Sequence, residues 1–378
     1  LVSYQHDPYQ HRPIDFRKTA PEEYSFADLL GMSQNTAIVG SAGSGNSTLL
    51  RRMLLCTIEN NEQASQRAPI PILVEFKKLD LDDAEAIEKA LNREFFRFSP
   101  MGVVEEFEAD LVDGSVMVLL DGLDELRAED RIAKALKHIK GFSQKYPKTR
   151  IVFTSRLLDI LENPTVLSDF LVLRITSLTP TQMIRFVNNW FGPDDPTGQR
   201  LAKFLEDPYS LHGLPRTPFT LALVAILYES GTKEIPANAT ELFSKYVELA
   251  LARWDTSKDI SLQFEWRIKR FILRKVGWNL HQQRKSGITC GDFETTVERC
   301  GAERGFPIDT TAFCREVVGR SELLLRNDDD EYEFRHRSFQ EYFVGAEINS
   351  RANSAEIAVE RFFDPWWSRP IFFACGLR

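Results

Sequence analysis

The sequence predicts an α/β domain, with a parallel sheet and flanking helices, followed by an all-α helical domain and a winged-helix domain. Two observations predict the first part: short apolar runs recur along residues 36–178, and amphipathic helical stretches lie between them. Strands that alternate with helices are typical of a parallel sheet covered by helices. A third observation predicts the rest, because helical periodicity replaces the strands after about Leu178.

The expected strands of the first domain are short apolar runs bounded by polar turns. They cover residues 36–39, 70–76, 116–120, 151–154 and 170–176. Continuous apolar runs of this length suit strands that are buried on both faces of a parallel sheet. Helical periodicity fills the stretches between them, for example residues 83–98 and 128–146. Residues 1–35 show no period and contain three prolines, so we expect an extended lead-in segment there.

The second half is expected to consist mainly of helices. One helix opens at Thr179, and others cover residues 218–229, 240–254, 264–281, 292–300 and 311–318. The last three are followed by a hairpin with strands at 321–326 and 331–334, a pattern typical of a winged helix. The predicted domains are the lead-in at 1–35, the α/β domain at 36–178, a helical domain at 179–235, a winged helix at 236–346, and the start of a second helical domain at 347–378.

The ends of the sequence suggest a piece of a longer protein. The chain begins at Leu1 and stops shortly after Trp366 and Trp367. We therefore expect this tryptophan pair to lack the packing that would cover it in the longer protein.

Composition excludes several classes of protein. The chain has 378 residues, with 47 Lys and Arg against 55 Asp and Glu, and its net charge of −8 argues against a general nucleic-acid coat, which needs a basic face. No apolar run is long enough to span a bilayer, and no signal peptide is visible. Five cysteines without a Cys-x-x-Cys pair indicate reduced, buried thiols in a cytoplasmic protein.

Between the first strand and the first helix of the α/β domain lies a phosphate-binding loop, G-x-x-x-x-G-K-[ST], complete at every required position except one. The loop consists of Gly40, Ser41, Ala42, Gly43, Ser44, Gly45, Asn46 and Ser47, and Thr48 follows it. Its glycines let backbone N–H groups point at a phosphate chain, and the following helix directs its positive end at the same phosphates. The Ser47 hydroxyl is placed to bind Mg²⁺. The sequence therefore predicts a P-loop nucleotide-binding domain that takes ATP or ADP with Mg²⁺.

Asn46 stands where this loop normally has lysine. The lysine reaches the β- and γ-phosphates as a point charge, whereas asparagine keeps an amide donor but is neutral and shorter. Loss of one charged hydrogen bond to phosphate weakens binding by about 1.5–3 kcal/mol, roughly 10- to 150-fold. We expect weakened nucleotide binding and strongly impaired hydrolysis. Asn46 is either a substitution that traps a state or a naturally degenerate site.

Acidic residues and an arginine follow two further strands. Asp121 ends an apolar strand, where it is placed to bind the Mg²⁺ that bridges the phosphates. Asp124 and Glu125 come three and four residues later and could orient or activate the attacking water. Arg156 follows the strand at 151–154, where it would reach the γ-phosphate. Asp124, Glu125 and Arg156 are the predicted catalytic residues, and Asp121 is a predicted metal ligand.

Two motifs resemble the NACHT family of signal-transduction ATPases, the STAND class. Residues 121–125 read Asp-Gly-Leu-Asp-Glu, and residues 334–343 read Phe-Arg-His-Arg-Ser-Phe-Gln-Glu-Tyr-Phe. The resemblance covers about residues 30–350 and implies that the strand at 151–154 lies between the loop strand and the acid strand. It also implies that Pro218 packs on the adenine and that His336 contacts the β-phosphate of ADP. Ser338 and Glu341 match a capping box, so we expect a helix to begin there.

The resemblance implies a nucleotide-controlled, oligomerising switch. ADP would close it through Pro218 and His336, and ATP would stabilise an oligomer with other copies of the chain. The N-terminal effector and the C-terminal sensor would lie outside this chain, the trigger would be a protein, and the setting would be innate immunity or bacterial anti-phage (antiviral) defence. No membrane partner is expected.

Three alternatives remain open at this stage. The first is a pseudo-ATPase scaffold, in which Asn46 is native and nucleotide binds without hydrolysis. The second is a turnover ATPase or a P-loop kinase, which should show an acceptor pocket or lid arginines. The third is a nucleic-acid-binding winged helix, which the acidic wing tip at 327–330 disfavours. The basic residues Arg267, Lys269, Arg270, Arg274, Lys275, Arg284 and Lys285 are instead expected on a solvated face or an oligomer surface.

Overall fold

The computed structural model divides the chain into two compact units, Leu1–Ser177 and Leu178–Arg378. The structure describes residues 2–3, 23–63, 69–98, 104–126, 129–156, 169–207, 214–231, 236–253, 264–305, 307–318, 321, 323–327 and 330–378. Each unit is described by itself.

The first unit is built on a six-stranded sheet with the order β1-β6-β2-β5-β4-β3. The strands are β1 (Val2–Ser3), β2 (Thr36–Gly40), β3 (Ile70–Glu75), β4 (Val116–Asp121), β5 (Arg150–Arg156) and β6 (Leu171–Arg174). All neighbouring strands from β2 through β6 pair in parallel. β1 pairs with β6 in the antiparallel direction at one edge of the sheet. All five predicted strands form, and β5 lies between β2 and β4 as expected.

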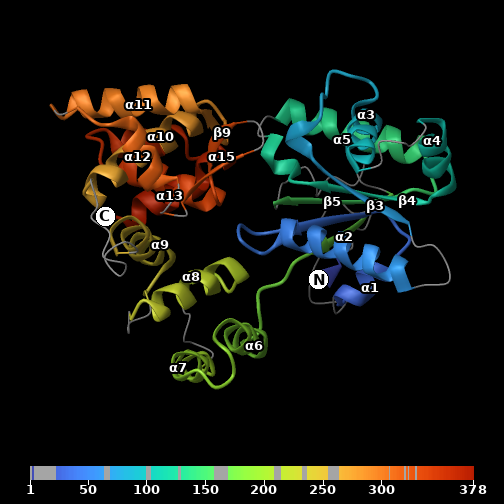
Figure 1. Cartoon of the computed structure of the whole chain (residues 1–378), viewed down its shortest axis with the longest axis horizontal. Helices are drawn as coiled ribbons and strands as arrows, with labels where there is room; N and C mark the ends of the chain where they lie inside the picture. Colours follow the sequence, from blue (N-terminus) through green and yellow to red (C-terminus); the bar gives the residue numbers. More distant parts are fainter. Residues whose placement is uncertain are drawn as a thin grey trace. The chain divides into compact units, whose positions relative to one another are not determined.

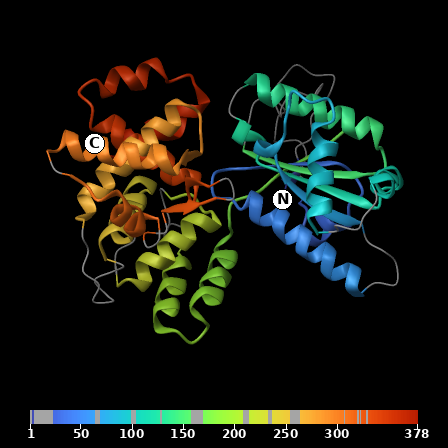
Figure 2. The same ribbon diagram turned by 45° about the horizontal axis from the view of Figure 1, so that its top comes forward.

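Alternate residues of the central strands face two different cores. Val116, Val118 and Leu120 of β4 pack with α3 (Ala86–Phe98), α4 (Val104–Asp113) and α5 (Glu129–Lys145). Met117 and Leu119 pack on the other face with α1 (Phe26–Gly31) and α2 (Asn46–Gln63). The two helical layers lie on opposite faces of the sheet (Figures 1 and 2). Burial on both faces explains why the strands read as continuous apolar runs.

The predicted extended lead-in at 1–35 is wrong at two places. Ser25 and Asp28 form a capping box that starts α1, and β1 pairs with β6. Arg150 of β5 donates hydrogen bonds to the carbonyls of Leu29 and Leu30 near the end of α1, at 2.6 and 3.2 Å. A six-residue helix has too few residues for a visible helical period. Its formation therefore depends on its cap and on this tertiary contact. The rest of the lead-in, residues 4–22, lies outside the described residues.

The second unit is mainly helical. Its helices are α6 (Pro180–Phe191), α7 (Pro196–Leu205), α8 (Pro218–Glu229), α9 (Ala239–Glu248), the π-helix η4 (Leu249–Arg253), α10 (Trp266–Gln282), α11 (Cys290–Glu303), α12 (Thr310–Val317), α13 (Arg337–Asn349), α14 (Ser354–Glu360) and α15 (Pro365–Gly376). Four of them begin with proline at the first position behind a capping Thr or Asp side chain, which explains why their starts are sharp.

A small antiparallel sheet interrupts these helices, with the order β7-β9-β8. β8 (Leu324–Arg326) and β9 (Glu331–Phe334) form the predicted hairpin, whose turn residues 328–329 lie outside the described part of the chain. β7 (Gly287–Thr289), which the sequence did not indicate, pairs with the outer edge of β9. Three residues are too short for a periodic signal, so only the pairing defines this strand.

The tryptophan pair is covered, contrary to expectation. Trp366 and Trp367 of α15 are buried in a core that also contains Trp278 of α10 and Val344 of α13. α13 and α15 approach so closely that a Cβ atom on Gly345 would lie 2.6 Å from the Phe373 Cβ atom. The chain therefore supplies the packing surface for this pair itself.

The expectation of a solvated basic face is only partly correct: Arg267, Arg284 and Lys285 are exposed, whereas three cations of α10 are paired with carboxylates. Lys269 is buried and forms an ion pair with buried Glu316 of α12, at 2.7 Å. Arg274 and Lys275 pair with Glu347 of α13, at 3.0 and 2.9 Å. Three of these charges are therefore neutralised by carboxylates of neighbouring helices, which the sequence could not show because the partners lie far apart in the chain.

No helix in the described part of the chain is long and apolar enough to cross a membrane.

The five cysteines are free thiols, but only Cys300 is buried and Cys375 is exposed, so the expectation of uniformly buried thiols is wrong.

Candidate functional site

The phosphate loop has the backbone that its glycines predict. Gly43 and Gly45 have φ of 76° and 99°, a left-handed conformation that residues with a Cβ rarely adopt. A Cβ atom on Gly40 would collide with the side chains of Ser44 and Asn46, so glycine is required there for close approach. α2 begins at Asn46, directly behind the loop. Ser47 and Thr48 therefore lie in the first turn of α2, where the helix dipole favours an anion.

The Asn46 side chain uses both of its polar groups inside the protein. Its Nδ2 donates to the backbone carbonyl of Ser155 on β5, at 2.9 Å, and its Oδ1 accepts from the Ser44 hydroxyl at 3.3 Å. The amide donor that we expected to face phosphate therefore contacts the end of a neighbouring strand. Ser155 is fully buried, and its hydroxyl makes no hydrogen bond among the described residues.

Asp121 lies at the carboxyl end of β4, where Thr154 of β5 fixes it. The Thr154 hydroxyl donates to Asp121 Oδ1 at 2.5 Å and accepts from the backbone N–H of Gly122 at 3.0 Å. Thr154 is fully buried, so the carboxylate is oriented by a rigid partner. The second carboxylate oxygen makes no hydrogen bond to the described residues.

Asp124 and Arg156 contact each other. Asp124 Oδ1 accepts from the backbone N–H of Arg156 at 3.0 Å, and Oδ2 lies 3.4 Å from the Arg156 Nε. Their side chains are only 10% and 22% exposed. Glu125, in the short 3₁₀ helix η2 (Leu123–Leu126), is exposed. Asp124 therefore positions the arginine, and Glu125 is the acid of this motif that reaches solvent.

The sheet order brings these groups to one edge. Gly40 is paired in register with Arg156, and β4 lies on the other side of β5. The carboxyl ends of β2, β5 and β4 are therefore neighbours, and ligands of open parallel sheets bind at such ends. A carboxylate with one free oxygen and a hydroxyl in the first helical turn are oxygen ligands that suit Mg²⁺, so Asp121 and Ser47 fit a site completed by phosphate oxygens.

Pro218 and His336 belong to the second unit, where one aromatic ring links them. Pro218 is the first residue of α8, behind the capping side chain of Thr217. The next residue, Phe219, stacks on the His336 imidazole with ring centroids 3.8 Å apart and an interplanar angle of 16°. The start of α8 and the start of α13 therefore lie together.

The predicted capping box of Ser338 and Glu341 is wrong. The N-cap of α13 is His336, whose Nδ1 accepts from the backbone N–H of Ser338 at 3.1 Å. Glu341 instead faces the guanidinium groups of Arg337 and Arg369, at 3.3 and 4.0 Å. The helix therefore begins two residues earlier than expected, and a histidine nitrogen accepts the N–H of Ser338 where a serine hydroxyl was expected to accept that of Glu341.

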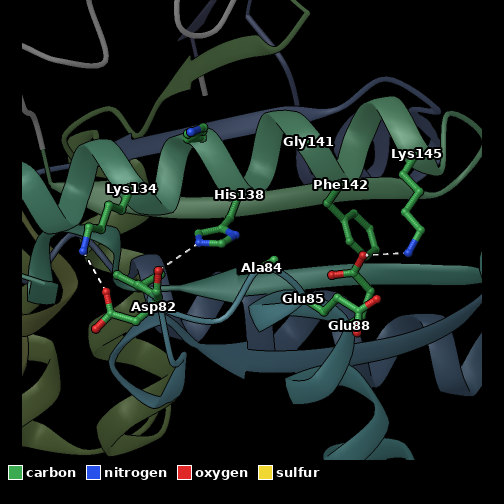
Figure 3. Close-up of a pocket in the computed structure, with 11 residues that line it drawn as sticks. Asp82, Ala84, Glu85, Glu88, Lys134, His138, Gly141, Phe142 and Lys145 are labelled. Carbon is green, nitrogen blue, oxygen red and sulfur yellow. Dashed lines mark hydrogen bonds and ion pairs between the residues drawn. The ribbon is translucent and has the colours of Figure 1, made fainter.

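An open groove of about 660 Å³ lies elsewhere in the first unit, between the chain that enters α3 and one face of α5 (Figure 3). Lys134 pairs with Asp82 across it at 2.7 Å, and Lys145 pairs with Glu88 at 3.2 Å. The groove contains none of the predicted site residues, and these charges are already paired.

Sequence reasoning missed two residues of the first unit that contact the predicted site residues and one residue of the second unit that contacts His336. Thr154 orients Asp121, Ser155 accepts the Asn46 amide, and Phe219 stacks on His336. The polar Thr-Ser pair at the end of an apolar strand was a visible signal. No sequence pattern indicated Phe219, because its partner is far away along the chain.

Comparison with known proteins agrees with this geometry. Residues 34–194 match the NACHT domain. No curated protein sequence matches the chain. The NACHT domain is a P-loop NTPase domain, and that class binds nucleotide, usually with Mg²⁺.

Several solved structures are similar. A signal transduction ATPase with numerous domains and a tetratricopeptide repeat sensor, from Pyrococcus horikoshii, is 12% identical over 93% of this chain and 47% of that one, with a TM-score of 0.44. Drosophila ORC bound to DNA is 13% identical over 84% of each chain, with a TM-score of 0.38. The Aeropyrum pernix ORC2 protein is 13% identical over 85% of this chain and 90% of that one, with a TM-score of 0.37.

Residues 34–194 of the chain are therefore assigned to the NACHT domain family.

Proposed function

We propose that the chain is a nucleotide-controlled switch that binds ATP and ADP with Mg²⁺ and hydrolyses ATP poorly. The observation that carries the proposal is the meeting of Gly40, Arg156 and Asp121 at the carboxyl ends of three neighbouring strands. The loop backbone and the first turn of α2 would bind the phosphates, and Ser47 and Asp121 would bind Mg²⁺. Arg156, positioned by Asp124, would face the γ-phosphate.

In the proposed switch, ADP closes the molecule and ATP opens it for assembly with further copies. Pro218 would pack on the adenine and His336 would donate to the β-phosphate. α10, α11 and α12 with the small sheet would act as a winged helix, the regions at 179–235 and 347–378 as helical domains. A nucleotide shifts this equilibrium only by its difference in affinity for the two states. A phosphate contact made by His336 in the ADP state alone would supply that difference. The proposal also includes effector and sensor domains outside this chain and a protein as the trigger. Its setting would be antiviral defence in the cytoplasm.

A lysine at position 46 tests the reason for weak hydrolysis. We expect Asn46→Lys to tighten Mg·ATP binding roughly 10- to 150-fold, the worth of one charged hydrogen bond, and to raise ATP turnover. Isothermal titration calorimetry and phosphate release on the whole chain would measure both. Asn46→Ala is the matched control, because it removes the amide contact to Ser155 without adding a charge.

One observation favours the pseudo-ATPase as a second candidate function. The Asn46 amide is integrated into the fold by its contacts to Ser155 and Ser44. Suppose that the unaltered chain binds ATP and ADP, and that Asn46→Lys gains no ATP turnover. Then the asparagine is not the cause of weak hydrolysis, and the pseudo-ATPase scaffold is the better description. If neither protein binds nucleotide, both proposals fail.

A further inference from the structure

The imidazole of His336 is fixed by contacts on its edge and its face. On the edge, Nδ1 accepts the backbone N–H of Ser338 at 3.1 Å. On the face, the Phe219 ring lies almost parallel, with centroids 3.8 Å apart. The ring therefore has little freedom to rotate about its χ angles. Because Nδ1 is the acceptor, a neutral imidazole carries its hydrogen on Nε2, so the ring is prepared as an N–H donor.

Phe219 is itself anchored in the core of the second unit. Its ring packs edge-on against Phe339 at 5.6 Å and lies 6.0 Å from Phe243. Phe339 and Phe243 are 2% and 4% exposed, whereas Phe219 is only half-buried. Phe219 is therefore a rigid platform, anchored in the core, whose face lies against the histidine ring.

The position of Phe219 in the chain adds a connection. It follows Pro218 directly, in the first turn of α8, which the Thr217 side chain caps. A displacement of this turn must move the Phe219 ring, and the ring contacts His336. The first turn of α8 and the N-cap of α13 are therefore mechanically linked by one side chain.

We infer that Phe219 is a positioning residue that fixes the Nε2–H of His336 toward a phosphate oxygen of a bound nucleoside diphosphate. Because Phe219 follows Pro218 directly, it also couples the phosphate contact of His336 to the base contact of Pro218. The inference rests on the proposed function, since it assumes that His336 and Pro218 meet the nucleotide. It adds that the diphosphate part of the ligand, and not the nucleoside, depends on Phe219.

The test compares the affinities of the whole chain for ADP and adenosine. Phe219→Leu keeps an apolar side chain but removes the flat ring, and we expect ADP to bind about 2- to 12-fold more weakly, the worth of an aromatic contact. Adenosine affinity should not change. Phe219→Tyr keeps the ring and should retain the affinity for ADP. In His336→Ala, a second substitution at Phe219 should add no further loss for ADP.

A measurement on the unaltered chain supports the test if Phe219→Leu does not fold. In the NMR spectrum, the His336 ring protons should be shifted upfield by the Phe219 ring, and its Nε2 resonance should move with ADP but not with adenosine. Equal weakening of ADP and adenosine by Phe219→Leu, or an unchanged ADP affinity, overturns the inference. If His336→Ala itself leaves ADP affinity unchanged, the latch in the proposed function is wrong instead.

Discussion

Asn46, Asp124 and Thr154 show how the site is organised at the level of single residues. Each uses its polar atoms to contact the end of a strand: Asn46 and Asp124 contact β5, and Thr154 of β5 contacts Asp121 of β4. These contacts place the groups that would meet phosphate and metal before any ligand arrives. Such preorganisation is what an electrostatic site needs, because the groups do not have to be reoriented on binding.

The contact of Asp124 with Arg156 predicts a role in stability. Asp124→Ala removes the acceptor of a backbone N–H and the partner of a guanidinium in a largely buried place, so we expect the free energy of unfolding to fall by about 1–3 kcal/mol. Asp124→Asn keeps an oxygen acceptor and should lose less. Urea unfolding followed by circular dichroism would measure both variants.

Glu125→Ala is the control for this prediction, because the side chain is exposed and the change should stay within about 0.5 kcal/mol. If Asp124→Ala were as stable as the unaltered chain, the carboxylate would have no positioning role, and the interpretation of Asp124 as an acid that activates water would be favoured.

At the scale of elements, the start of α13 both stabilises the fold and carries the proposed contact to the nucleotide. His336 caps the helix, and its ring joins the aromatic cluster of α8, α9 and α13. The helix is buried along almost its whole length, so its start must be fixed accurately. The His336 side chain therefore caps the helix and is also the proposed contact to phosphate. A test must separate its effect on stability from its effect on ADP binding.

A pair of substitutions separates them. His336→Ala removes the cap and should lower the free energy of unfolding by about 0.5–2 kcal/mol, whereas His336→Asn provides a good capping acceptor and should recover that part. Both variants remove the imidazole that would contact phosphate, so both should weaken ADP binding. Urea unfolding and calorimetry with ADP would give the two quantities.

Ser338→Ala completes the comparison. Because the structure assigns the cap to His336, the serine hydroxyl should be dispensable to within about 0.5 kcal/mol. A loss as large as that of His336→Ala would reinstate the capping box that the sequence suggested.

At the scale of the whole molecule, the two units have separate hydrophobic cores. The second unit contains a buried carboxylate, Glu347, that is 1% exposed and meets Arg274, Lys275 and Arg351. Burial by itself would raise the pKa of Glu347, but the hydrogen bond from Lys275 and the charges of Arg274 and Lys275 outweigh it. The pKa of Glu347 therefore lies below its ordinary value of 4.5.

This charge centre predicts acid sensitivity in the second unit. A carboxylate whose pKa is lower in the folded state stabilises the fold above its unfolded pKa, and the contribution disappears as the pH falls through the folded pKa. Unfolding of the second unit should therefore become easier below about pH 4.5. All six tryptophans, at positions 190, 254, 266, 278, 366 and 367, lie in this unit, so tryptophan fluorescence in urea reports on it alone.

Glu347→Gln should be destabilised at pH 7 by about 3–5 kcal/mol, because three cations lose their shared partner, and its urea midpoint should change less between pH 6 and about 3.5. Glu356→Gln, which alters an exposed carboxylate of α14, is the matched control and should titrate like the unaltered chain. An identical pH dependence in Glu347→Gln would show that the acid response arises elsewhere.

The sequence predicted those parts of the site that are local in the chain. The loop Gly40–Ser47 carries its own backbone requirements, and Asp121 and Arg156 follow apolar strands that the sequence marks clearly. The contacts between them were not predictable, because Thr154 meets Asp121 and Asn46 meets Ser155 across strands far apart in the chain. The same reason explains the missed stack of Phe219 on His336.

By itself, the sequence determined the five parallel strands, most of the helices and the position of the phosphate loop. Period, capping residues and glycine positions are properties of short segments, so they can be read without the fold. Only the tertiary structure decided which polar groups pair. It tied the amide of Asn46 to β5, buried Lys269 against Glu316 and covered Trp366 and Trp367. Burial and pairing depend on partners that come close in space alone, and a buried polar group stays only where such a partner satisfies it.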